Sequence, residues 1–390
     1  MAHLSISRKF FIARDASEGF IAECDEALAS IARNEELSAD RKVGHAVLAQ
    51  KAHALMMTGR ISEGERVLHE LISEYLVNPD HFSDETLFDI FDRLCIANVK
   101  QNNIVSAKNY NDLSLAVAKK KSDRSLEVIA HRTRTKLYFY LDKQEACNSF
   151  SFVSRSIRNG SYDRIKTCNE IAELLHTLSF DPSCYKEAQV DGQTLLAHAE
   201  ERNYGWATTR AYLLLATCGY LGRGHANLDM AKEYIAKGVN SCIRFSISDS
   251  IWQFYNLQGI VDTSLNYEIN EIKKVFLTVH AILKHQSLLQ VSAGEFCCGS
   301  PLALSNIGFF FASKGLETEF FNIMGGIMYG YRKECDYDCS NTACNYVCPA
   351  NFEELKSAYR DARRHRALFA TQEPKNALRD PSTDYFIVLS

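Results

Sequence analysis

A single unit recurs along most of this chain: a helical pattern of apolar residues, a short polar or glycine-containing turn, and a second helical pattern. In the first clear copy, residues 46–57 form the first pattern, residues 58–60 the turn, and residues 62–75 the second pattern. Ser62 followed by Glu65 has the spacing of a capping box, which predicts a helix start at this point. A lone hairpin cannot bury the apolar face that such a pattern creates, so the recurrence predicts that hairpins stack on one another.

Six further copies follow the first one. They run over residues 84–100 with 105–121, 126–141 with 145–157, 162–179 with 184–201, 206–221 with 228–242, 251–265 with 269–284, and 302–313 with a return to about 329. Successive turns fall roughly 40 to 43 residues apart until the last interval, which is longer. We therefore predict an all-α fold, a right-handed solenoid of about seven stacked helical hairpins. An irregular all-α domain has the same local pattern and is the alternative.

The composition agrees with a folded helical protein. The 390 residues include only six prolines, and strand signals are weak. A formal net charge of −4 gives no general attraction to nucleic acids or anionic lipids. No stretch is apolar enough for a signal peptide or a membrane span, so we expect no membrane partner. Thirteen cysteines are scattered, which is typical of reduced thiols and favours a cytoplasmic location.

One stretch resembles the tetratricopeptide repeats (TPR). Leu304, Ile307 and Gly308, followed by Phe311 and Gly315, are similar to that family's pattern of a large apolar residue, Leu-Gly, an aromatic residue and a turn glycine. The resemblance covers residues 46–331 as an architecture, although the family's unit has about 34 residues. It implies an α-solenoid whose concave face binds a peptide or protein. Units of the length found here resemble those of bacterial peptide-sensing regulators and of the sensor arrays of signalling ATPases.

The pattern divides the chain into four parts. Residues 1–45 are predicted to form N-terminal capping helices, and residues 46–331 the repeat array. Residues 332–371 would form a cysteine-rich loop and a basic helix, and residues 372–390 a C-terminal tail.

Polar residues on the first helix of each hairpin are the candidates for contact with a partner, because the first helices usually line the concave face of a solenoid. Arginine can bind carboxylates, and asparagine can hold a peptide backbone. The predicted partner-binding residues are Arg93, Asn98, Arg132, Arg134, Arg210, Asn256 and Asn306. The last of these falls where the tetratricopeptide family often places an asparagine facing its ligand.

A cysteine cluster follows the last hairpin. Its four members, Cys335, Cys339, Cys344 and Cys348, could close a tetrahedral site around structural zinc. Their spacing lacks the usual two-residue separation of paired zinc ligands, so free thiols or one or two disulfides stay open as alternatives. The helix beyond the cluster carries Arg363, Arg364 and Arg366, which could grip phosphates, although a solvated face is the preferred interpretation.

The sequence lacks the common motifs of catalytic sites. The chain has no phosphate-binding loop, no His-Glu-x-x-His motif, no Gly-x-Ser-x-Gly elbow and no kinase motifs. We therefore expect a non-catalytic scaffold or adaptor that binds a protein or peptide. One alternative is a cytosolic peptide-sensing regulator that works with a separate output protein. The other is a nucleic-acid-associated factor that uses the cysteine-rich and basic C-terminal region.

Overall fold

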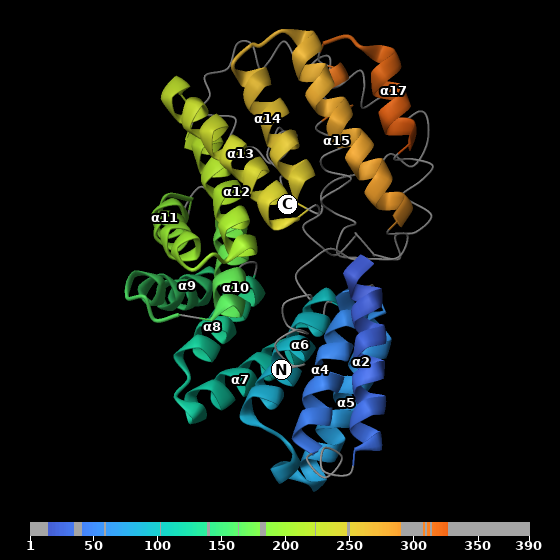
Figure 1. The fold of residues 1–390 in the computed structure, drawn as a ribbon. Coiled ribbons are helices and arrows are strands. Elements are labelled where there is room, and N and C mark those ends of the chain that lie inside the picture. The colour runs from blue at the N-terminus through green and yellow to red at the C-terminus, as the bar shows by residue number, and fades with distance from the viewer. Residues whose placement is uncertain are drawn as a thin grey trace. The chain divides into compact units, whose positions relative to one another are not determined.

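The structure is a computed structural model that describes residues 15–34, 41–57, 60–101, 103–138, 141–162, 164–179, 185–222, 224–247, 250–289, 307–308, 310–312 and 314–326. Over these ranges every regular element is a helix (Figure 1), which confirms the all-α prediction. The α-helices within these ranges include α2 (Asp15–Arg33), α4 (Arg41–Met57), α5 (Ile61–Val77), α6 (Asp84–Lys100), α7 (Ile104–Lys121), α8 (Arg124–Tyr138), α9 (Lys143–Arg158), α10 (Ile165–Leu178), α11 (Tyr185–Glu201), α12 (Gly205–Gly222), α13 (His225–Phe245), α14 (Ile251–Ser264), α15 (Ile269–Leu289) and α17 (Glu317–Gly326). A short 3₁₀ helix, η1 (Pro79–His81), precedes α6.

Helices that are neighbours in the sequence pair with one another. The pairs α4 with α5, α6 with α7, α8 with α9, and α14 with α15 reproduce the predicted hairpins. The N-terminal helix α2 packs on α4 through Phe20, Ile21 and Cys24, which are buried against Val47 and Leu55. Helix α4 begins at Arg41, so its first turn lies within the segment predicted to cap the array.

Several helices begin at a polar residue that satisfies a free backbone N–H group. Ser83 Oγ accepts a hydrogen bond from the Thr86 N–H at 3.1 Å, and Asp142 Oδ1 accepts from Gln144 and Glu145. The capping box predicted at Ser62 and Glu65 is wrong. Helix α5 already begins at Ile61, its N-cap residue Arg60 makes no side-chain cap, and the Arg60 guanidinium instead pairs with Glu63.

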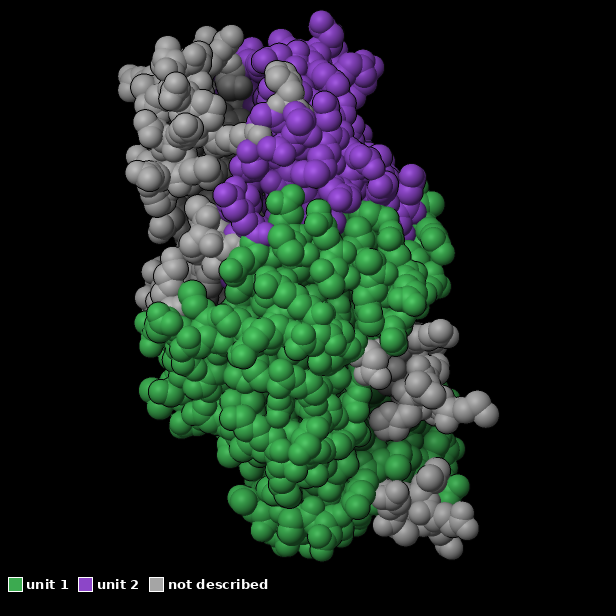
Figure 2. All heavy atoms as spheres, turned by 90° about the vertical axis from the view of Figure 1, so that its left-hand side faces the viewer, with its two compact units in different colours: residues 1–176, 187–214, 243–248 green, residues 177–186, 215–242, 249–390 purple. Residues whose placement is uncertain are grey.

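The chain divides into two compact units (Figure 2). Unit 1 comprises residues 1–176, 187–214 and 243–248, and unit 2 comprises residues 177–186, 215–242 and 249–390. Unit 1 therefore contains α2, α4 to α9, and most of α10 and α11. Helix α12 contributes its first part to unit 1 and its last part to unit 2.

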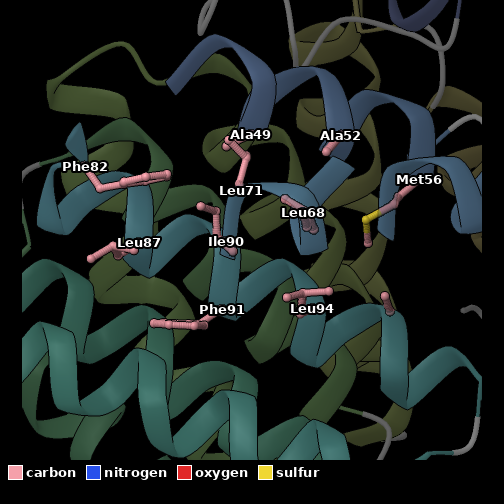
Figure 3. Packing of buried hydrophobic residues seen from close by; sticks show 11 residues of the cluster. Ala49, Ala52, Met56, Leu68, Leu71, Phe82, Leu87, Ile90, Phe91 and Leu94 are labelled. Carbon is pink, nitrogen blue, oxygen red and sulfur yellow. The ribbon is translucent and has the colours of Figure 1, made fainter. Parts of the chain in front are cut away.

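Side chains from three helices form a hydrophobic cluster in unit 1 (Figure 3). Ala52 and Met56 of α4 face Leu68 of α5, and Ile90 and Leu94 of α6 complete the cluster. Burying each large side chain contributes about 1.5–3 kcal/mol to stability. A single hairpin could not bury these side chains alone. The cluster thus joins one hairpin to the next, as the repeat pattern predicts.

Four connections after second helices share one backbone geometry in unit 1, whereas the connection from α5 to α6 has Asn78 at a φ of −133°. Ser122, Gly160, Asn203 and Ser246 each have a positive φ, between 52° and 61°, one or two residues after the end of a second helix. At the first of these, the Ser122 N–H donates to the Lys119 carbonyl and the Asp123 N–H donates to the Ala118 carbonyl. This pair of bonds is a Schellman motif, which ends a helix and satisfies its last carbonyls. Residues 160 and 203 end their helices with the same two bonds.

Unit 2 contains close approaches between helices. An ideal Cβ atom at Gly238 of α13 would lie 2.0 Å from Phe254 Cε1 of α14, and one at Gly259 of α14 would lie 2.5 Å from Phe276 Cε1 of α15. Glycine is therefore the residue that lets each helix approach the aromatic ring of the next. The Phe276 ring in turn lies 5.0 Å from the ring of Phe310.

Candidate functional site

Charged side chains from the first helices of three consecutive hairpins meet in unit 1. We call this set the polar face; it consists of Asp89, Asp92 and Arg93 of α6, Arg132 and Lys136 of α8, and Lys166, Asn169, Glu170 and Glu173 of α10. Within each helix these residues are three or four positions apart or adjacent, so they share one side of the helix. The three helices are α6, α8 and α10 in Figure 1.

Helix α8 is bound to the helices on both sides of it. The Thr133 hydroxyl donates to Asp92 Oδ1 of α6 at 2.7 Å. On the other side, Arg132 Nη2 lies 2.6 Å from Glu170 Oε2 and 2.9 Å from Glu173 Oε2 of α10. The separation between Asp92 and Thr133 is 41 residues, one structural repeat. Equivalent positions of successive hairpins therefore bind one another.

A second contact spans two hairpins. Lys166 Nζ of α10 lies 2.5 Å from Asp89 Oδ1 of α6, although 77 residues separate them. The other oxygen of Asp89 accepts a hydrogen bond from the Gln50 amide of α4 at 3.3 Å. One carboxylate thus connects the first helices of three hairpins, and α6 and α10 approach each other on this side.

Three side chains of the polar face, Glu173, Lys136 and Lys166, are partly exposed to solvent. The exposed fractions of the side chains are 41% for Glu173, 29% for Lys136 and 28% for Lys166. The Arg132 and Glu170 side chains are only 6% and 10% exposed. The polar face therefore has a buried floor and a partly exposed rim.

The ionic contacts and the burial shift the pKa values of this set in opposite directions. Burial raises the pKa of Asp92, and the charges of Arg93 and Arg132 oppose this only in part. Burial alone would also raise the pKa of Glu173, but Lys136 and Arg132 together hold that pKa well below its usual range. At pH 7 the charged form of Glu173 is therefore stabilised, whereas burial favours the neutral form of Asp92.

The predicted partner-binding residues have different surroundings. Arg93, Asn98, Arg132 and Asn256 are buried. The Asn98 amide donates to the Leu94 carbonyl of its own helix, and the Arg210 guanidinium lies 5.0 Å from the Trp206 ring. Asn306 lies outside the described residues.

Arg134 is directed toward other helices than Arg132. Its Nε lies 2.5 Å from Glu145 Oε1 of α9, and its Nη1 lies 2.6 Å from Asp112 Oδ1 of α7. Of the predicted set, Arg93 and Arg132 come together in the polar face, and Arg134 binds the second helices instead.

Several residues of the polar face on α8 and α10 were not predicted from the sequence, including Glu170 and Glu173, the partners of Arg132. Lys136, Asn169, Glu170 and Glu173 were not singled out, because glutamate and lysine on a helix are ordinarily solvated. A signal did exist in the sequence, since Arg132 and Glu173 have the 41-residue separation of the repeat. Opposite charges one repeat apart on first helices would have indicated the pair.

The predicted zinc ligands Cys335, Cys339, Cys344 and Cys348, and the basic helix beyond them, lie outside the described residues. Within the described part of the chain, no group of three or more His, Cys, Asp or Glu side chains is arranged to hold a metal ion. The zinc site and the nucleic-acid role of the C-terminal region stay predictions.

The cysteines that the structure describes form no disulfide bonds with one another. Cys24, Cys95, Cys168, Cys218 and Cys242 are buried, and Cys147 is exposed. Burial raises the pKa of Cys24 to about 11 and that of Cys218 to about 12. These two thiols stay protonated at neutral pH and act as small apolar core residues, as predicted.

In the ranges covered by the structure, none of the helices combines the length and the apolar character that crossing a membrane requires. Comparison of the sequence with protein-family models and with curated proteins gives no match.

Proposed function

We propose that this chain is a non-catalytic scaffold or adaptor that binds a peptide or protein along the polar face. The observation that supports this most directly is the partly exposed rim, in which charged side chains of α8 and α10 stand over a buried, ion-paired floor. Side chains held in place by ion pairs lose little conformational freedom when a ligand binds. Charges in such a rim attract and orient a partner.

The proposal takes the hairpins to continue as one right-handed solenoid of the tetratricopeptide type. The shared turn geometry at residues 122, 160, 203 and 246 supports it, as do hydrogen bonds between residues one repeat apart, such as Arg164 with Asp123 and Arg244 with Asn203. In repeat arrays of this kind each hairpin contacts mainly its neighbours, and the continuous face serves for binding. The free thiols of the described part favour the cytoplasm as the site of action.

The proposal is tested by selecting peptides from a random library with the immobilised full-length chain. We expect a set of peptides with related sequences, whose dissociation constants can be measured by fluorescence anisotropy. Lys136→Gln should weaken their binding because Lys136 belongs to the rim. The matched control Lys108→Gln removes an exposed lysine from α7, a second helix, and should leave binding unchanged. Failure to enrich any related peptides, or equal effects of the two variants, would contradict the proposal.

A further inference from the structure

Arg93 is a buried arginine whose charge is not neutralised. Its exposed fraction is 7%. Among the residues that the structure describes, it forms neither a hydrogen bond nor an ion pair, and it interacts electrostatically with Asp92, its neighbour in sequence. A guanidinium with little exposure to water and no counter-ion is unfavourable. Arg93 is therefore a residue for which a partner is expected.

Asn169 is a second buried polar residue that lacks partners. It is 2% exposed, and over the described residues neither its amide nitrogen nor its amide oxygen has a hydrogen-bond partner. An asparagine amide can donate two hydrogen bonds and accept two. Burying this amide without any of them is unfavourable, so a further hydrogen-bonding group at this position would be stabilising.

The contact between α6 and α10 puts these two residues at corresponding positions of the two helices. Lys166 Nζ and Asp89 Oδ1, 2.5 Å apart, fix the two helices beside each other. Arg93 lies four residues after Asp89, and Asn169 lies three residues after Lys166, so each is one helical turn further along the same side. The carboxyl of Asp92 lies within electrostatic range of both Arg93 and Glu170, the neighbour of Asn169, which agrees with this register.

The charges of the polar face indicate which group fits between them. Lys166 is neutralised by Asp89, and Arg132 and Lys136 are neutralised by Glu170 and Glu173. Asp92 accepts a hydrogen bond from Thr133, and its burial favours the uncharged form. Arg93 is then the cation of the polar face that has no carboxylate of its own. One planar guanidinium matches the two oxygens of one carboxylate.

We propose that Arg93 and Asn169 together bind a carboxylate of a peptide ligand, either its C-terminal carboxylate or an aspartate or glutamate side chain. Arg93 donates two parallel hydrogen bonds to the carboxylate oxygens, and the Asn169 amide donates to one oxygen or accepts the N–H of the adjoining peptide unit. The inference rests on the proposed peptide-binding function, since it names the chemical group that the polar face recognises.

The test is a titration of the full-length chain labelled with ¹⁵N-arginine, in which the Nε–H resonance of Arg93 is followed at constant ionic strength. The probes are acetate, N-acetyl-diglycine, its C-terminal amide, and inorganic phosphate. We expect acetate and N-acetyl-diglycine to shift the Arg93 resonance saturably and the amide to leave it in place. The resonance of Arg155, an exposed arginine whose Nε binds the Ser151 carbonyl, should not move.

Two variants of Asn169 sharpen the test. Asn169→Ala should weaken acetate binding about tenfold, because one hydrogen bond to a charged group is lost. Asn169→Asp places a carboxylate beside Arg93 and should abolish acetate binding while raising the melting temperature. These opposite changes in stability separate the proposal from general damage to the fold. An Arg93 resonance that ignores both carboxylates, tighter binding of phosphate than of acetate, or a lower melting temperature for Asn169→Asp would overturn it.

The experiments distinguish failure of the carboxylate site from failure of the proposed peptide-binding function. If library peptides bind wild type and Asn169→Asp with equal affinity, the peptide-binding function holds and this carboxylate site is wrong. If acetate binds at Arg93 but no peptides are enriched, the site chemistry holds and the peptide-binding function fails. A terminal carboxylate and an acidic side chain are distinguished by amidating the C-terminus of the selected peptides.

Discussion

Arg132 and Glu170 form the most deeply buried ion pair of the polar face, 2.6 Å apart with side chains 6% and 10% exposed. Replacing Arg132 by methionine leaves Glu170 buried without its cation. We expect the free energy of unfolding to fall by about 3–5 kcal/mol, measured by urea denaturation. Adding Glu170→Leu to the same chain should recover part of this loss, because the unpaired charge is removed.

The matched control for this prediction is Arg66→Met. Arg66 pairs with Glu70 at 2.6 Å, but both side chains are more than 60% exposed. Water screens such a pair, so the expected change is within about 1 kcal/mol. Similar losses for Arg66→Met and Arg132→Met would contradict the argument from burial.

His131 makes the stability of the fold dependent on pH. Its ring stacks on Phe152 with centroids 4.1 Å apart, and burial, together with Arg134 and Lys119, lowers its pKa from 6.5 to about 4. Between pH 6.5 and 4 the unfolded chain binds a proton at this residue that the folded chain does not. Stability should therefore be fully present above pH 6.5 and decrease as the pH falls toward 4.

The measurement compares melting temperatures at pH 7 and pH 4.5 in wild type and in His131→Phe. The variant keeps an aromatic ring against Phe152 and cannot be protonated, so its melting temperature should fall less over this interval. His69→Phe, at an exposed histidine of α5, should keep the wild-type pH dependence. A His131→Phe chain that follows the wild-type pH dependence would show that another group is responsible.

At the scale of single residues, the sequence could indicate which arginines were candidates for binding, but not which neighbouring helix each side chain contacts. Arg132 and Arg134 are two positions apart, which on a helix turns them to nearly opposite sides. The first therefore binds α10 and the second binds α7 and α9. Burial of Asn256 and Arg93 was not predictable either, because polar side chains are exposed unless tertiary contacts cover them.

At the scale of helices and turns, the hairpin connections give a direct prediction. Ser122 has a φ of 52°, in the left-handed region where a side chain is unfavourable. Ser122→Gly should raise the free energy of unfolding by about 1 kcal/mol, and Gly160→Ser should lower it by a similar amount. The control Ser73→Gly, on the exposed side of α5, should destabilise, because glycine weakens a helix interior.

A second prediction concerns the approach of α13 to α14. Gly238→Ala places a methyl group within 2.0 Å of the buried Phe254 ring. The helices or the ring must then move, which should cost about 1–3 kcal/mol in urea denaturation. Gly44→Ala is the control, since nothing lies within 4 Å of its Cβ position in α4, and it should stabilise by up to about 1 kcal/mol.

Helix positions were largely predictable because apolar periodicity and turn residues act locally. The bounds predicted for the hairpin at 84–100 and 105–121 agree with α6 and α7 to within one residue. The start of α5 was not predicted correctly, because Ser62 and Glu65 lie inside a helix that begins without a side-chain cap. A capping motif indicates only a local preference for a helix start, and the packing of α5 on α4 determines where the helix begins.

At the scale of the whole molecule, a repeat array and an irregular domain respond differently to local damage. In an array each hairpin depends mainly on its neighbours. Gly238→Ala should therefore accelerate amide hydrogen exchange in α13 and α14, and leave exchange in α4, α5 and α6 unchanged. Hydrogen exchange followed by mass spectrometry of peptides measures this directly. Faster exchange throughout the described helices would instead favour the irregular all-α domain.

The long-range arrangement is the part that the sequence could not supply. A separation of one repeat, as between Asp92 and Thr133, follows from the period of the hairpins. The contact of Lys166 with Asp89 does not, because it depends on how far each hairpin is rotated against the one before. That rotation results from many side-chain contacts and leaves no pattern of its own in the chain.

The carboxylate of Asp89 has a consequence for how this chain could change in evolution. Proteins built from hairpins commonly grow or shrink by gaining or losing whole copies. Between α6 and α10, however, the bond from Asp89 to Lys166 is compatible with one intervening hairpin and no other number. Duplicating or deleting α8 and α9 would separate the two charges, so a change of length here would lose this bond.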